Sequence, residues 1–528
     1  MRSARAYHAL CLLFALDLGV SVSACSSRDS ILARGSVKDD PRGAGGGGGN
    51  PGDAANDAAN PTGNIFVNPT TGSDTNSGLS SSEALKTISK AAEVAHARPG
   101  TETILLEDGP YDEATQPNLD LIFPAGTIVS AVSTTGVTIV GPGVTNAFAF
   151  VDGGGIRNVT FDRFDKGVRA TGTGAFTMTG IHFRNVYWPL RVGDSVVATV
   201  DASGSVPFAT RPDNGFGEWC IKVEGASTMN FRGGEFRDIQ DGGWTIFHAS
   251  GHTKLAIDRT VFNTTAPRAI TIYENADVVL TNSQIHRVAM NSQTPSDLNA
   301  AIVMGIGGAE DPLDPTLEVR NSEITFNENA SGIALTMDPS FPSKPVIKIT
   351  DSHIDSNGQD GLFVDNPTSP RSQLVTIQVV NSTFIENLRS GIALGAGAVL
   401  VTGGEFSRNR NGIEVADSAQ VNLLKVRGPV KFAANFEHGI SFTGAAGSSL
   451  DLGKTSDPGR ITFTTVQANY SAVNLQSALQ GFAVGNTWLL NAQGANEAGV
   501  YTTPTTITGP ASGLNATIVT GGSLVVVE

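Results

Sequence analysis

The sequence predicts an all-β solenoid, a three-sided parallel β-helix with an N-terminal capping α-helix. Three observations support this prediction. The chain has 528 residues, of which 61 are glycine and only 16% are charged, and this is typical of turn-rich β proteins. A turn-like residue followed by an apolar residue recurs along the chain at intervals of 22 to 53 residues. Short strands such as Gly-Ile-Ala-Leu come before these turns at similar intervals.

The recurring turn is the clearest of the three signals. The turn residues are Asn158, Gly180, Gly233, Asp258, Asn282, Asn321, Asp351, Asn381 and Gly403. Three positions after them stand Phe161, Phe183, Phe236, Val261, Ile285, Ile324, Ile354, Phe384 and Phe406. The shortest intervals fit one coil, and the longer ones fit coils with an inserted loop or an uncounted rung. We therefore expect each apolar position to form a ladder in the core.

Asparagines recur six positions after several of these turns. They are Asn327, Asn357, Asn387, Asn409 and, after a tenth copy of the turn, Asn435. Equivalent turns in stacked coils place these amides above one another, where they can hydrogen-bond as a ladder. The alternative is an exposed polar row that binds sugar. We expect the ladder.

The N-terminus has the features of an export signal. Arg2 and Arg5 precede an apolar run that is too short to span a bilayer. The run ends in Val-Ser-Ala-Cys25, which resembles a bacterial lipobox. The resemblance implies a signal peptide over 1–24 and lipidation of Cys25. Residues 25–63 are rich in Gly, Asn and Asp, which favours a flexible tether. We expect an exported, lipid-anchored protein of the cell envelope, and Ser26 after the cysteine is compatible with the outer membrane. The alternative is an ordinary secretory signal.

Order is expected from residue 64 onward. Residues 64–112 form an N-terminal module in which Leu85, Ile88, Ala92 and Ala95 share one face of a helix over 83–97, capped by Ser81 or Ser82. Its Gly72-Ser73-Asp74, Asn76-Ser77-Gly78 and Gly109-Pro110-Tyr111 elements resemble a module of unassigned function that opens bacterial right-handed parallel β-helix proteins of the pectin-lyase-like superfamily. That resemblance implies a right-handed helix over 64–484. Residues 485–528 resemble the closing coil and cap of such proteins, and capped ends favour a monomer.

Aromatic residues gather where the repeat is interrupted. The 53-residue interval carries Tyr187, Trp188 and Trp219, and Trp244 follows in the next coil. Aromatic rings with charged neighbours are suited to sugar faces and hydroxyl groups. These residues are therefore candidate ligand-binding residues. The alternative is a loop that packs its aromatic side chains onto the coils.

Acidic and histidine residues near this interruption are candidate catalytic groups. Arg237, Asp238, Asp241 and His248 lie close together in sequence. Two carboxyl groups can act as acid and base in glycan hydrolysis. The insertions at 187–219 and 291–299 enter at the same turn and would wall a groove along one face. Ordinary turn residues are the alternative for both aspartates.

Further aspartates occur at the opposite turn of successive coils. Asp311, Asp314, Asp338 and Asp365 would lie along one edge of the stack. Carboxylate oxygens gathered in this way are suited to Ca²⁺. Because Asp-Pro is also common in turns, a purely structural role is the alternative.

The formal net charge of −15 disfavours a nucleic-acid partner and unassisted binding of acidic glycans. Three functions remain open: polysaccharide binding, a polysaccharide lyase or hydrolase, and a structural spacer or adhesin. The lipid anchor would be the only contact with the membrane.

Overall fold

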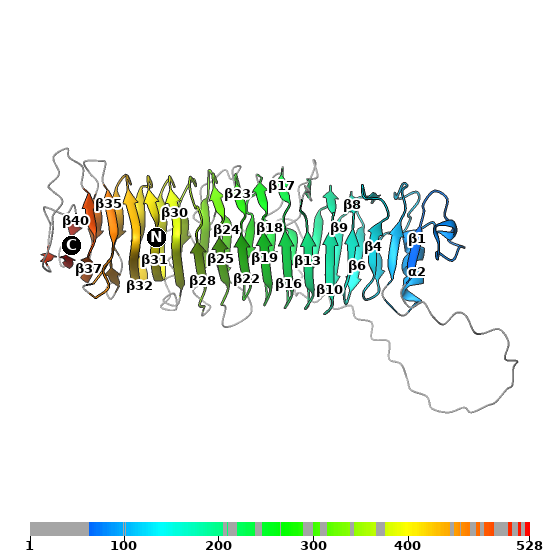
Figure 1. Cartoon of the computed structure of the whole chain (residues 1–528), viewed down its shortest axis with the longest axis horizontal. Helices are drawn as coiled ribbons and strands as arrows, with labels where there is room; N and C mark the ends of the chain where they lie inside the picture. Colours follow the sequence, from blue (N-terminus) through cyan, green and yellow to red (C-terminus); the bar gives the residue numbers. More distant parts are fainter. Residues whose placement is uncertain are drawn as a thin grey trace, which may run out of the picture. The chain divides into compact units, whose positions relative to one another are not determined.

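The protein is a parallel β-helix, seen here in a computed structural model (Figure 1). The structure describes residues 63–98, 100, 102–203, 208–209, 219–237, 245–264, 266–288, 299–306, 314–337, 343–365, 375–443, 448–454, 456–464, 471–475, 480–489, 505–508, 516–518 and 523–527. All belong to one compact unit, residues 60–528. The predicted all-β solenoid is confirmed, with three parallel sheets that run along the stack.

The first sheet pairs one strand of each coil with the equivalent strand of the next. Its strands are β3 (Leu121–Phe123), β6 (Asn146–Val151), β9 (Lys166–Thr171), β12 (Trp188–Val192), β15 (Trp219–Val223), β18 (Thr245–Ala249), β21 (Ile270–Ile272), β24 (Ala300–Ile306), β27 (Ser331–Met337), β29 (Leu362–Val364), β33 (His438–Phe442), β36 (Ser471–Leu475) and β40 (Ala516–Ile518).

The second sheet follows the first in each coil. Its strands are β1 (Asn64–Val67), β2 (Thr103–Leu106), β4 (Ile128–Ala131), β7 (Gly154–Arg157), β10 (Ala175–Thr179), β13 (Val197–Asp201), β16 (Thr228–Arg232), β19 (Lys254–Asp258), β22 (Asp277–Thr281), β25 (Thr316–Arg320), β28 (Val346–Thr350), β34 (Ser449–Asp451), β37 (Gln480–Val484) and β41 (Ser523–Val527). At the C-terminal end, β39 (Thr505–Thr508) pairs antiparallel with β41.

The third sheet completes the coil with shorter strands. They are β5 (Val137–Val140), β8 (Val159–Asp162), β11 (His182–Arg184), β14 (Phe208–Ala209), β17 (Glu235–Arg237), β20 (Val261–Asn263), β23 (Gln284–His286), β26 (Glu323–Thr325), β35 (Ile461–Thr464) and β38 (Thr487–Leu489). Three long strands bend through several sheets: β30 (Thr376–Ile385), β31 (Ser390–Ser407) and β32 (Asn411–Ala433).

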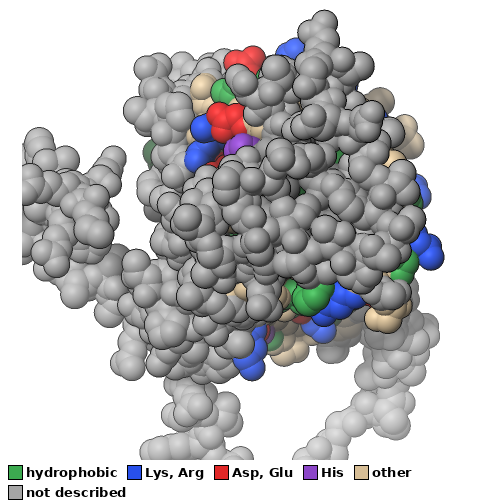
Figure 2. Space-filling model, turned by 90° about the vertical axis from the view of Figure 1, so that its left-hand side faces the viewer, with side chains coloured by type: hydrophobic (Ala, Val, Ile, Leu, Met, Phe, Trp, Pro, Cys, Tyr) green, Lys and Arg blue, Asp and Glu red, His purple; other side chains and the backbone are tan. Residues whose placement is uncertain are grey.

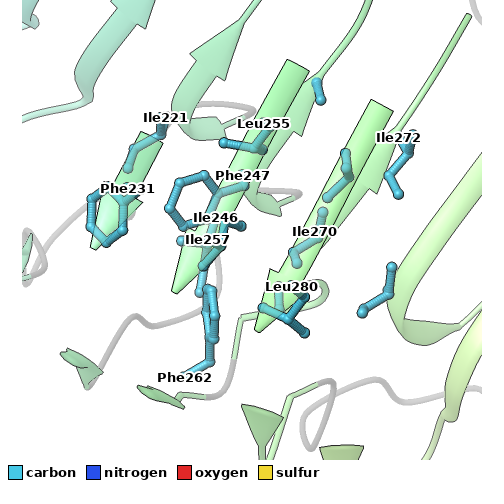
Figure 3. Close-up of a cluster of buried hydrophobic side chains, with 14 of the residues drawn as sticks. Ile221, Phe231, Ile246, Phe247, Leu255, Ile257, Phe262, Ile270, Ile272 and Leu280 are labelled. Carbon is cyan, nitrogen blue, oxygen red and sulfur yellow. The ribbon is translucent and has the colours of Figure 1, made fainter. Parts of the chain in front are cut away.

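The core consists of inward side chains stacked in register. Figure 3 shows Phe247 between Ile221 and Ile270, its partners on the neighbouring coils. In the third sheet Phe384 and Phe406 stack with 5.1 Å between ring centroids. Burial of one such side chain contributes roughly 1.5–3 kcal/mol. Because every coil repeats the ladder, the stack is stable without a disulfide in its described part, where Cys220 is a buried free thiol.

The asparagine ladder is present as predicted. The side-chain amide of Asn327 donates to Oδ1 of Asn357 over 2.7 Å, and that of Asn357 donates to Oδ1 of Asn387 over 2.9 Å. The same pattern continues through Asn409 to Asn435. All five side chains are buried, so these amides are structural.

The N-terminal helix is shorter than predicted. It is α2 (Ile88–His96), preceded by the single 3₁₀ turn η1 (Ser81–Glu83). Thr87 caps it, since its hydroxyl accepts from the Lys90 amide over 3.1 Å. Leu85 lies before the helix and bridges to Val67 of β1. Ile88, Ala92 and Ala95 are buried as expected, so the helix covers the first coils with its apolar face (Figure 1).

One position of the predicted ladder is wrong. Phe262, and not Val261, pairs with Phe236 and Ile285 in the core. The turn residue of this coil is Arg259, which has φ of 53°, and it stands one position later than Asp258. The long interval between Gly180 and Gly233 contains an uncounted rung, because Phe208 pairs with Phe183 and Phe236.

Figure 2 shows the C-terminal end of the stack. Near one edge of this view, acidic, basic and histidine side chains of described residues lie close together. None of the described helices has the length and apolar character that crossing a bilayer requires.

Candidate functional site

The insertions of the chain adjoin one sheet. Three segments come before strands of the first sheet: 210–218 before β15, 238–244 before β18, and 289–298 before β24, from which Asn299 separates it. Residues 307–313, 338–342 and 366–374 come after β24, β27 and β29 of the same sheet. These segments lie outside the described residues. Both sets of insertions therefore adjoin strands of the first sheet in the chain.

Two tryptophans meet on this face. Trp188 of β12 and Trp219 of β15 stack with 5.8 Å between ring centroids and 19° between ring planes. The Tyr187 ring lies next to the Trp188 ring, with 5.0 Å between ring centroids. Both indole rings, which we call the tryptophan pair, are only partly buried. The structure thus places three predicted ligand-binding residues together, and Trp244 lies outside the described residues.

Cationic side chains surround the tryptophan pair. The ammonium of Lys166 lies 5.4 Å from the centroid of the Trp188 ring, and that of Lys222 lies 5.6 Å from the Trp219 ring. Both distances are in the range of cation–π attraction. The sheet register makes Arg169, Arg191 and Lys222 neighbours on successive strands, and we call these three the basic row.

Glu224 holds two members of the basic row, Arg191 and Lys222, in place. Its carboxylate pairs with Arg191 and, over 2.7 Å, with Lys222. Burial alone would raise the pKa of Glu224, but the hydrogen bonds and charges of Lys222 and Arg191 outweigh it and lower that pKa. The carboxylate therefore stays ionised and leaves a net positive charge on this part of the sheet.

His248 lies beside the basic row, on the next strand of the sheet. It pairs with Lys222 in the register, its Nδ1 lies 3.0 Å from the Thr271 hydroxyl, and its ring lies 5.4 Å from that of Tyr273. Burial and, to a smaller extent, the charge of Lys222 lower the pKa of His248 to about 4, against the opposing effect of Glu224. The imidazole is therefore neutral near pH 7, when it can accept a proton.

The other predicted catalytic residues do not share this position. Arg237 belongs to β17 of the third sheet and pairs with Glu235 over 2.6 Å. His248 belongs to the first sheet, so the two lie on different sides of the coil. Asp238 and Asp241 fall outside the described residues.

Of the four predicted calcium ligands, two are among the described residues and two are not. Asp311 and Asp338 lie outside the described residues. Asp314 is an exposed turn residue whose carboxylate accepts from the Lys344 amide over 3.1 Å. Asp365 is partly buried at the end of β29. In the described ranges, no three His, Cys, Asp or Glu side chains gather closely enough to hold a metal ion.

A second feature of the first sheet was not predicted. A pocket of about 130 Å³ lies over β29, β31 and β32, and its lining includes Phe363, Asp365, Arg389, Ala393, Gly395 and Glu414. Glu414 lies in a stretch whose sequence matches the regular repeat, and it alternates with the buried residues Ile413 and Val415. Only the small side chains beside it turn this position into a pocket.

Together, these features define an all-β, right-handed parallel β-helix with an aromatic and basic patch on its first sheet. A family model described as "Right handed beta helix region" matches residues 219–426. Among solved structures, the chain is similar to the A-module of the mannuronan C-5 epimerase AlgE6 from Azotobacter vinelandii. The identity is 12%, the match covers 83% of this chain and 94% of that chain, and the TM-score is 0.22. No curated protein matches the sequence.

Proposed function

We propose that the protein is a cell-envelope lipoprotein that binds an acidic polysaccharide along the outer face of its first sheet. The observation that carries this proposal is the tryptophan pair, two stacked and partly exposed indole rings on neighbouring strands. Indole rings offer a large apolar surface to the C–H faces of sugars at a low cost in conformational entropy. Tyr187 extends the same surface.

The basic row supports an acidic rather than a neutral glycan. The chain as a whole carries a formal charge of −15, which would repel a polyanion. On the first sheet this is reversed locally. Lys166, Arg169, Arg191 and Lys222 lie on neighbouring strands, and in the described part of the chain Glu224 pairs with Arg191 and Lys222. Arg191 and Lys222 are suited to sugar carboxylates because they are already held in position.

A lipid anchor would hold this surface near a membrane. The lipobox-like sequence before Cys25 supports attachment to a membrane, and the Gly/Asn/Asp-rich residues 25–63 support a tether between the lipid and the β-helix. A β-helix held near the envelope would meet polysaccharides there.

One observation favours a second function, a polysaccharide lyase. His248 is neutral near pH 7 and lies beside Lys222 and Tyr273. In β-elimination, a base removes the proton next to the uronate carboxylate, a C=C bond forms as the bond to the leaving oxygen breaks, and the leaving oxygen takes up a proton from water. Lys222 would neutralise the carboxylate and His248 would be the base.

Retention on immobilised polyuronate and on a neutral glycan of equal length tests the proposed binding. We expect retention on the polyuronate that decreases with salt. Equal retention on both materials, or none, would exclude the proposal. Ultraviolet absorbance of the unsaturated product separates a lyase from a binding protein in the same sample.

A further inference from the structure

We propose that the pocket over β29, β31 and β32 is a separate site for a single amino-sugar residue. This inference rests on the proposed function, because it takes the ligand to be a glycan. The pocket lies on the same sheet as the tryptophan pair. The strands β18, β21, β24, β27 and β29 separate β15 from β31.

The shape of the pocket follows from the register. Phe363, Ala393 and Glu414 are neighbours on successive strands of the first sheet and point outward. Because the methyl group of Ala393 is small, a hollow remains between the Phe363 ring and the Glu414 carboxylate. Gly395 extends the hollow along the strand, beside Asp365. A volume of about 130 Å³ is comparable to the size of one sugar ring, so the hollow itself would hold one residue of a chain.

The Glu414 carboxylate is held ready for a ligand. Its Oε2 accepts from the Ser390 hydroxyl over 2.6 Å and from the Asn411 amide over 3.0 Å. Ser390 is fully buried and Asn411 is 3% exposed, so both donors are fixed by the fold. Because both hydrogen bonds end on Oε2, Oε1 is the oxygen that can accept from a ligand.

The charges of the pocket favour a cation. Asp365 and Glu414 contribute two carboxylates, whereas Arg389 is the one cationic side chain of the lining. The Arg389 guanidinium is 3.6 Å from the buried Asp360 carboxylate, which offsets its charge. The pocket therefore has the opposite sign to the basic row. A sugar ring that carries an ammonium group would place its apolar face on Phe363 and its ammonium near Glu414 and Asp365.

The two sites together would bind a glycan that contains both an acidic sugar and an amino sugar. Strands are about 4.8 Å apart, so β15 and β31 are separated by roughly 29 Å on the sheet. A glycan that occupies both sites must span that length.

Titration of the full chain with glucosamine, glucose and glucuronate, followed by calorimetry, tests the inference. We expect glucosamine to bind at least tenfold more tightly than the other two sugars. The variants Glu414→Gln and Ala393→Leu should abolish that preference, the first by removing charge and the second by filling the hollow. Equal affinity for glucosamine and glucose, tighter binding of glucuronate, or no binding of glucosamine would overturn the inference.

Matched controls keep the outcome interpretable. Glu405→Gln removes a carboxylate from the neighbouring strand, β31, in the part of it that belongs to the third sheet, where Glu405 pairs with Lys431 over 3.0 Å. Ala149→Leu enlarges an equivalent outward position of the first sheet, on β6. Both should bind glucosamine as the unaltered chain does. Trp188→Ala should also leave glucosamine binding unchanged, so failure of polyuronate binding and failure of this pocket are distinguishable.

Discussion

The rings of Trp188 and Trp219 stack at 5.8 Å on neighbouring strands of the first sheet, and Lys166 and Lys222 lie over the two rings. This relationship joins an apolar platform to positive charge on one surface. The following predictions test what that surface and the fold beneath it do.

Replacement of either tryptophan should weaken glycan binding. We expect Trp188→Ala and Trp219→Ala each to lower polyuronate affinity about 5- to 30-fold, which corresponds to about 1–2 kcal/mol of lost ring contact. Trp219→Phe should retain most of the affinity. Phe482→Ala removes another ring under a lysine, Lys454, but on the second sheet. That variant should bind normally, and an equal loss there would contradict a specific role for the tryptophan pair.

Loss of charge from the basic row should change the salt dependence of binding. Lys222→Gln removes a cation that also neutralises Glu224. We expect affinity for a polyuronate to fall about fivefold at low salt and the difference to shrink as salt screens the charges. Lys431→Gln, on the third sheet, is the matched control. An unchanged affinity in Lys222→Gln, measured by calorimetry at two salt concentrations, would remove the basic row from the site.

His248 should make the protein less stable in acid. Burial lowers the pKa of His248 to about 4, below the value near 6.5 of an unfolded chain. Between these values the unfolded state binds more protons, so acidification from about pH 6.5 to pH 4 favours unfolding. We expect His248→Gln to flatten that part of the pH dependence.

Urea denaturation midpoints between pH 4.5 and 7 measure this effect. His353→Gln is the control, because that imidazole is more than half exposed. If the pH dependence of His248→Gln matches that of the unaltered chain, His248 is not buried in its neutral form.

The asparagine ladder should contribute strongly to stability. The Asn387 side chain accepts from the amide and side chain of Asn357, and donates to the Ile354 carbonyl and to Asn409. We expect Asn387→Ala to lower the free energy of unfolding by about 2–4 kcal/mol, because it leaves several buried groups unpaired. Asn435→Ala, at the end of the ladder, should cost less. Denaturant titration of both variants measures the difference, and a loss below about 1 kcal/mol at Asn387 would contradict the prediction.

Cys25 should determine membrane attachment. We expect Cys25→Ser to move the protein from the membrane fraction to the soluble fraction and to abolish labelling with a fatty acid. A Ser26→Ala variant should still be labelled. Membrane association of Cys25→Ser that resists carbonate washing would argue against a lipid anchor at this position.

Much of this fold is visible in the sequence because a solenoid repeats its constraints. Asn387 and Asn409 are 22 residues apart, and the same spacing sets their side chains one above the other. The register error at Val261 has a physical cause as well: Arg259 adopts the left-handed conformation in place of an asparagine or glycine. The helix began later than expected because Thr87 caps it and Leu85 is needed in a bridge to β1.

The surface was harder to predict than the core. The aromatic residues stood out because they interrupt the repeat, whereas Arg169, Arg191 and Lys222 become neighbours only through the sheet register. Glu414 follows the alternation of the repeat, between the buried residues Ile413 and Val415, so its local sequence does not distinguish it from an ordinary outward residue. Its position in a pocket depends on the small size of Ala393 and Gly395, which belong to the preceding coil.

The parallel register has a consequence for how such a protein can change. Each coil advances by one strand spacing, about 4.8 Å, so distances along the first sheet change in steps of that size. Insertion or removal of one complete coil between β18 and β29 would shift the pocket relative to the tryptophan pair by one such step and leave the geometry of both intact. The length of glycan that is recognised would then change in whole steps, without redesign of either site.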